Sequence, residues 1–92
     1  MEFSQIQKDI VKYLIKFSEV DYFDNPEGFL APSLDTLPKI FKGKYSNLEL
    51  EECARELVSS GVLKPYSFHS YLRLTETFIT SNAYRLLNSD KI

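Results

Sequence analysis

The sequence has 92 residues, enough for one folded domain and too few for two, so residues 1–92 are expected to form a single domain. Hydrophobic residues make up 43% of the chain, and its seven Phe and six Tyr residues each bury a large area on folding, which excludes a disordered chain. The formal net charge of -2 lacks the basic excess that is usual for proteins bound to phosphate backbones, although a local basic patch suffices for such binding.

Cysteine content and hydropathy exclude two further classes of protein. Cys53 is the only cysteine, so no internal disulfide forms, and a disulfide-stapled secreted scaffold is excluded. Residues 1–6 show no basic start followed by an apolar run, and no stretch approaches the ~18 apolar residues that span a bilayer. We therefore expect a cytoplasmic protein that does not insert into a membrane.

The first predicted element is an amphipathic helix at roughly 3–18, where apolar residues recur at steps of three and four. These residues are Phe3, Ile6, Ile10, Tyr13, Leu14 and Phe17. Val11 and Ile15 widen the apolar arc, so the helix is expected to pack on two neighbours or to take part in an oligomer contact.

An acidic loop at 21–28 follows, and then a very short strand is expected at 29–31. Pro38 would clash in the interior of a helix, but it lies in the tolerated first turn if Thr36 is the N-cap. A short second helix is therefore predicted near 37–42, ended by Gly43.

The third predicted helix, at 46–60, has the clearest boundaries. Ser46 and Glu49 have the spacing of a capping box, and Gly61 suits the left-handed position that ends a helix. Its buried stripe consists of Leu50, Cys53, Ala54, Leu57 and Val58. A step of 100° per residue then places on its outer face Leu48, Glu52, Arg55 and Ser59.

Two short extended runs, 62–68 and 71–75, predict a hairpin with its turn at His69-Ser70. In this register the opposed pairs are Lys64 and Thr75, Tyr66 and Arg73, and Phe68 and Tyr71. The other face, expected to meet the core, carries Leu63, Pro65, Leu72 and Leu74. Thr75 can cap a last helix, whose apolar face would be Phe78, Ile79, Ala83, Leu86 and Leu87.

The order of these elements resembles the winged helix-turn-helix superfamily over nearly the whole chain. The strongest local likeness is Gly61-Val62-Leu63, followed by Tyr71-Leu72-Arg73-Leu74-Thr75-Glu76, which is similar to a passage in MarR-like and PadR-like regulators. The chain departs from that pattern at Phe78 and in the acidic loop. The resemblance implies an α+β, mainly helical winged helix, with a three-helix core, a two-stranded wing and a C-terminal helix.

The resemblance also implies double-stranded DNA as the partner, with the third helix in the major groove and the hairpin on the phosphate backbone or in the minor groove. A phosphate site is expected where lysines lead into the N-terminus of the third helix. Its residues are Lys42, Lys44, Ser46 and Asn47, with Arg55 farther along the helix. Against this, the same helix carries four carboxylates, at Glu49, Glu51, Glu52 and Glu56. Glu51 has the spacing for an ion pair with Arg55, the only guanidinium of the helix.

The outer face of the hairpin is the second candidate surface. It gathers cations and rings: Lys64, Tyr66, Phe68, Tyr71 and Arg73. Such residues hold phosphates and stack on bases, but they are equally enriched at protein interfaces.

Catalysis finds no support in the sequence. His69 is the only histidine and Cys53 falls on a buried stripe, so no metal site or catalytic pair is expected. None of the three glycines belongs to a phosphate-cradling loop, and no cofactor is expected.

Two functions stay open. The leading one is a DNA-binding module of the transcription-regulator type, dimeric through its first and last helices. The alternative is a winged-helix protein interaction adaptor that does not bind DNA, such as one of phage, viral or mobile-element origin. A continuous positive strip across the third helix and the wing would favour DNA, and a negative third helix would favour a protein partner.

Overall fold

The computed structural model describes residues 3–19, 32–65 and 72–89. The elements are α1 (Gln5–Glu19), α2 (Leu37–Ile40), α3 (Asn47–Ser59), β1 (Leu63–Pro65), β2 (Leu72–Leu74), α4 (Glu76–Ile79) and α5 (Asn82–Ser89). The described residues are mainly helical and include one two-stranded antiparallel sheet, in agreement with the α+β class. The expected acidic loop at 21–28 and strand at 29–31 lie outside the described residues.

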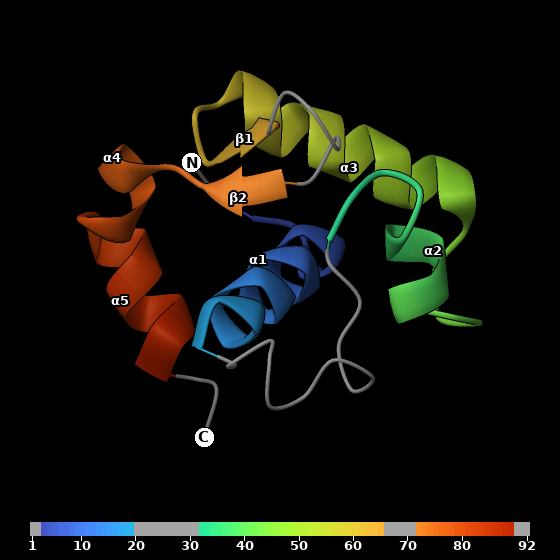
Figure 1. Cartoon of the computed structure of the whole chain (residues 1–92), viewed down its shortest axis with the longest axis horizontal. Helices are drawn as coiled ribbons and strands as arrows, with labels where there is room; N and C mark the ends of the chain where they lie inside the picture. Colours follow the sequence, from blue (N-terminus) through green and yellow to red (C-terminus); the bar gives the residue numbers. More distant parts are fainter. Residues whose placement is uncertain (1–2, 20–31, 66–71, 90–92) are drawn as a thin grey trace.

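Helix α1 crosses the middle of the molecule, with α2 and α3 to one side and α4 and α5 to the other (Figure 1). It begins at Gln5, later than the predicted start at residue 3, because a capping box forms at Ser4. The Ser4 hydroxyl accepts from the Gln7 N–H at 3.2 Å, and the Gln7 side chain accepts from the Ser4 N–H at 3.0 Å. The spacing of Ser4 and Gln7 is that of a capping box and is visible in the sequence. The prediction followed the apolar periodicity instead and began the helix at residue 3.

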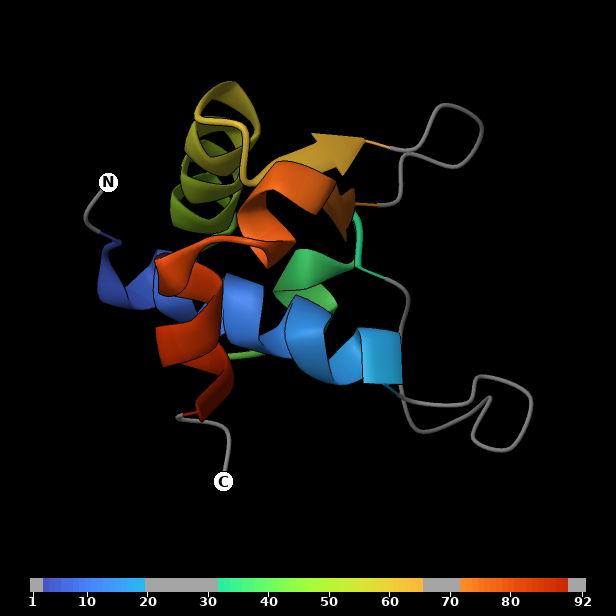
Figure 2. The ribbon, with the colours of Figure 1, turned by 90° about the vertical axis from the view of Figure 1, so that its left-hand side faces the viewer.

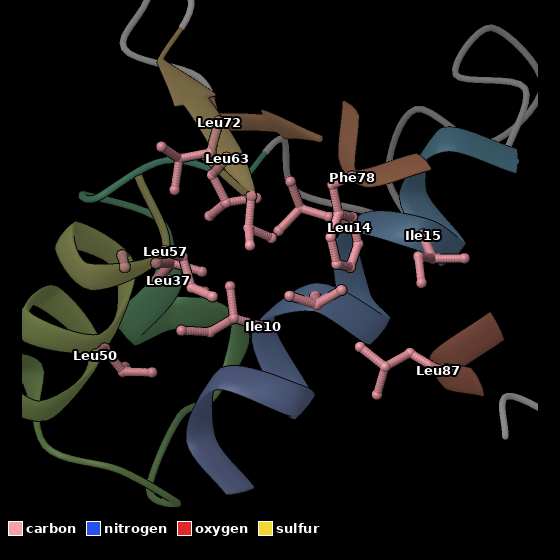
Figure 3. Close-up of a cluster of buried hydrophobic side chains, with 13 residues drawn as sticks. Ile10, Leu14, Ile15, Leu37, Leu50, Leu57, Leu63, Leu72, Phe78 and Leu87 are labelled. Carbon is pink, nitrogen blue, oxygen red and sulfur yellow. The ribbon is translucent and has the colours of Figure 1, made fainter. Parts of the chain in front are cut away.

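The core forms around α1, which packs against α3, α5 and β2. Figure 3 shows side chains converging from α1, α2, α3, both strands, α4 and α5. Its buried members are Ile10, Val11, Leu14, Ile15, Leu37, Leu50, Ala54, Leu57, Val62, Leu63, Leu72, Phe78 and Leu87. Val11 and Ile15 are 0% and 1% exposed, so the side of the α1 arc that they widen is buried against neighbouring elements.

Helix α2 ends at Ile40, two residues earlier than predicted. Thr36 occupies the N-cap position, as expected, but its side chain makes no capping hydrogen bond to α2. Instead the Ser33 N–H donates to the Thr36 hydroxyl at 2.7 Å, and the Thr36 N–H donates to the Ser33 hydroxyl at 3.1 Å. The threonine therefore stabilises the turn before the helix rather than the helix itself.

Helix α3 follows the prediction most closely. The Ser46 hydroxyl accepts from the Glu49 N–H at 3.2 Å, which confirms the N-cap, and Gly61 adopts a φ of +84° at the end of the helix. The Glu49 carboxylate accepts from the Ser46 hydroxyl at 3.1 Å, whereas a complete capping box would bring it to the Ser46 N–H.

The strands pair in a register shifted by two residues from the prediction. Lys64 opposes Arg73, flanked by the pairs Leu63 with Leu74 and Pro65 with Leu72. The predicted turn at His69-Ser70 lies outside the described residues. A shift of two keeps each side chain on its face, so Leu63 and Leu72 are buried as expected, although Pro65, farther out, is exposed.

A third segment touches the sheet. The Leu72 N–H donates to the carbonyl of Pro32 at 2.8 Å, and Ser33 forms an isolated bridge. This contact brings the 33–36 turn to the side of the sheet. Both α3 and the strands lie on the same side of α1 (Figure 2), so the turn, α3 and the sheet adjoin one another.

The predicted last helix is two helices, α4 and α5, separated at Thr80 and Ser81. Thr75 caps α4 as expected, accepting from the Phe78 N–H at 3.2 Å. Ser81 interrupts the helix, since its hydroxyl donates to the Phe78 carbonyl at 2.6 Å and accepts from the Tyr84 N–H at 3.2 Å.

The break changes which residues of this segment are buried. Phe78 and Leu87 belong to the core, but Ile79 is 43% and Leu86 69% exposed, so their predicted place on the buried face is wrong. One continuous helical period no longer relates the residues before the break to those after it.

Candidate binding surface on α3 and the sheet

The outer face of α3 is acidic. Glu49, Glu51, Glu52 and Glu56 are all exposed. The Arg55 guanidinium donates to the Glu51 carboxylate from Nη2 at 2.8 Å and from Nε at 3.2 Å, which confirms the predicted ion pair. Because this pair neutralises the only cation of the helix, the outer face of α3 keeps a net negative charge.

The four carboxylates are spread over the outer face and both flanks of α3. Glu56 lies on the flank next to α1, where it accepts a 2.9 Å hydrogen bond from the buried amide of Gln7. Cys53 lies on the same flank, 3.9 Å from the Ser4 hydroxyl, and burial raises the pKa of its thiol. Glu51 lies on the opposite flank, toward the sheet, and Glu52 lies on the outer face between the two flanks.

Beside that second flank lies a hollow of about 320 Å³, which we call the α3–sheet hollow. It is lined by Leu34, Ala54, Arg55, Val58, Ser59, Pro65 and Leu72. Five of these residues are apolar, and the polar groups belong to Arg55 and Ser59. Leu34, in the 33–36 turn, is 38% exposed, so one wall of the hollow presents apolar surface to solvent.

A second exposed apolar residue lies near the other end of the helix. Leu48, in the first turn of α3, is 64% exposed, as its predicted place on the outer face requires. It precedes Glu51 by three residues and Arg55 by seven, and it therefore shares their flank.

The expected phosphate site at the start of α3 is only partly assembled. Lys42 and Asn47 are exposed, but the Ser46 hydroxyl is engaged in its cap. The Lys44 ammonium makes a 3.0 Å ion pair with Asp9 of α1, so this lysine links the loop before α3 to α1. The sequence could not indicate this pair, because 35 residues separate its members.

Asp9 is the centre of a polar cluster. It accepts hydrogen bonds from the Tyr45 hydroxyl, from Lys44 and from the Gln5 amide at 3.0 Å. Burial raises the pKa of Asp9, but these three hydrogen bonds outweigh burial and hold that pKa below its ordinary value of 3.8. The bond to Asp9 raises the pKa of Tyr45, and likewise that of Lys44.

On the predicted wing, the structure brings Lys64 and Arg73 together. They oppose each other across the two strands, and both are exposed. The ring-bearing residues of the predicted surface, Tyr66, Phe68 and Tyr71, lie outside the described residues, as does His69.

Across residues 3–19, 32–65 and 72–89, no three His, Cys, Asp or Glu side chains gather as metal ligands would. None of the helices described is both long and apolar enough to cross a bilayer. Comparison of the chain with family models, curated proteins and solved structures found no match. The α3–sheet hollow was not predicted, because the contact between residues 32 and 72 that helps to form it has no signal in the sequence.

Proposed function

We propose that this chain is a winged-helix domain that binds a protein partner through the outer face of α3 and the adjoining sheet. The order α1, bridge, α2, α3, β1, β2 supports the winged-helix assignment, because it is the order that the sequence resemblance implies. The recognition helix would be α3, and the wing would be the hairpin of β1 and β2.

One observation carries the choice of a protein over DNA: α3 has four exposed carboxylates, and its one guanidinium is paired with Glu51. A helix that enters the major groove passes between two phosphate backbones, and unpaired carboxylates there are repelled. A partner protein with lysines or arginines is attracted by the same charges.

DNA is the second candidate function, favoured by the Lys64 and Arg73 pair on the sheet. Two cations at opposed positions suit a phosphate, and exposed Lys42 adds a third cation near the start of α3. These cations would suffice for contacts with the phosphate backbone. Recognition of the bases would still require the acidic helix α3 to enter the major groove.

A direct test compares the two ligands. We expect no polarisation change when the chain is titrated into labelled random duplex DNA at about 50 mM salt, where phosphate contacts are strongest. Salt-dependent binding that disappears in Lys64→Ala/Arg73→Ala would support DNA and contradict the proposal.

The positive arm uses a displayed library of random peptides of about twelve residues. We expect selected peptides to bind Glu51→Lys/Glu52→Lys roughly tenfold or more weakly, because the double variant reverses two charges at the interface. Glu76→Lys, in the exposed first turn of α4, is the matched control and should leave binding unchanged. Equal loss in both variants would show that net charge alone drives binding.

Dimerisation is a separate proposal. With Val11 and Ile15 buried, it depends on the exposed Ile79 and Leu86 of α4 and α5. Light scattering at high concentration measures the oligomeric state, and a monomeric mass would contradict dimerisation.

A further inference from the structure

We infer that the partner supplies a basic segment that inserts one large apolar side chain into the α3–sheet hollow. This inference rests on the proposed function and specifies the chemistry of its ligand. The occupant is a peptide segment bearing Leu, Ile, Met or Phe, with lysine or arginine beside it.

The size and lining of the hollow favour a side chain over a cofactor. Its volume of about 320 Å³ lies at the small end of the range of roughly 300–1,000 Å³ that ligand sites occupy. The base of the hollow is formed by buried Ala54 and Leu72, and Leu34 and Pro65 stand at its exposed wall. An inserted apolar group would shield this wall from water. Burial of apolar surface is the main driving force for such contacts.

The charge beside the hollow favours a basic neighbour to that apolar residue. Both hydrogen bonds from Arg55 go to Oε1 of Glu51, which leaves Oε2 of that carboxylate for a second cation. Within the described part of the chain, Glu52 makes no ion pair. Two carboxylates thus lie one turn from the hollow, and a partner lysine or arginine would reach them while the apolar side chain stays anchored.

Leu48 sets the length of the segment. Ten residues separate it from Val58 at the hollow, which is about 15 Å along a helix. A partner helix of about ten residues or an extended segment of about five covers that distance. A segment of this length would contact apolar surface at both ends and carboxylates between them.

The experiment uses the full chain and the peptide library described above. We expect selected peptides to combine a large apolar residue with at least one lysine or arginine. A synthetic copy should bind Leu34→Lys roughly tenfold or more weakly, since burial of a leucine-sized side chain is lost. Leu86→Lys is the matched control, because Leu86 is 69% exposed on α5. The amide signals of Ala54, Val58 and Leu72 should shift on titration.

Three outcomes would overturn the inference: no peptide is selected, the selected peptides lack a large apolar residue, or Leu34→Lys binds as well as wild type. If Leu34→Lys binds normally while Glu51→Lys/Glu52→Lys does not, the hollow is not the anchor site and the proposed function stands. If the charge reversal also has no effect, both fail. Thermal unfolding of each variant, unchanged from wild type, shows that a loss of binding is not a loss of folding.

Discussion

Helices α1 and α3 are both amphipathic and both begin at a serine cap, yet the domain covers them to different extents. On α1 the widest part of the apolar arc is enclosed, and Ile10, Val11, Leu14 and Ile15 are at most 3% exposed. On α3 the flank toward the sheet stays open, with Leu48 64% exposed and a hollow beside Val58. The number of apolar residues on a helix therefore does not identify the interface, because neighbouring elements decide which of them stay exposed.

The largest expected effect tests the enclosed helix. Ile15→Ala should lower the free energy of unfolding by about 2–5 kcal/mol, because it leaves a cavity in a packed core. Chemical denaturation measures this change. A cost below about 1 kcal/mol, together with loss of a dimer in light scattering, would place Ile15 at an interface between chains and reverse the comparison.

The next effect tests the polar contact that fastens α1 to the loop before α3. Asp9→Asn should lower the free energy of unfolding at neutral pH by roughly 1–2 kcal/mol, since it removes the charge that the Lys44 and Tyr45 hydrogen bonds stabilise. Asp35→Asn, at an exposed carboxylate, is the matched control and should change stability little.

The same contact gives a pH dependence. Because the pKa of Asp9 is lower in the folded chain than its ordinary 3.8, the unfolded chain takes up this proton first as the pH falls. The stabilisation is therefore complete above the unfolded value and is lost as the pH falls through the folded one. Wild type should lose stability relative to Asp9→Asn as the pH falls through the unfolded value of 3.8 and on through the lower folded value. Parallel profiles for the two proteins would contradict this account.

The caps of the two helices give a smaller effect. Ser4→Ala and Ser46→Ala should each lower the free energy of unfolding by about 1 kcal/mol, because each serine hydroxyl accepts a hydrogen bond from an N–H of the first turn. Ser59→Ala, at an exposed site near the end of α3, should cost less than either. If Ser4→Ala leaves the free energy of unfolding unchanged while Ser46→Ala lowers it, the start of α1 is fixed by packing and not by its cap.

The features predicted correctly from the sequence depend on neighbouring residues. The Ser46 cap, Gly61, the pair of Glu51 with Arg55 and the Thr75 cap all join residues at most four apart, and helical geometry fixes such contacts. The strand register, by contrast, depended on an assumed turn at His69-Ser70, and it was wrong by two residues. Asp9 with Lys44 and Pro32 with Leu72 join distant segments, so no local pattern could indicate the polar cluster or the hollow.

The smallest expected effect tests the open flank. Leu48→Ser should change the free energy of unfolding by less than about 0.5 kcal/mol, because its side chain is already mostly in water. The matched change Leu57→Ser, at a fully buried position on the same helix, should be severely destabilising. A cost for Leu48→Ser above about 1.5 kcal/mol would mean that another part of the chain covers this leucine. The flank of α3 would then be occupied within the domain, and the partner would have to bind elsewhere.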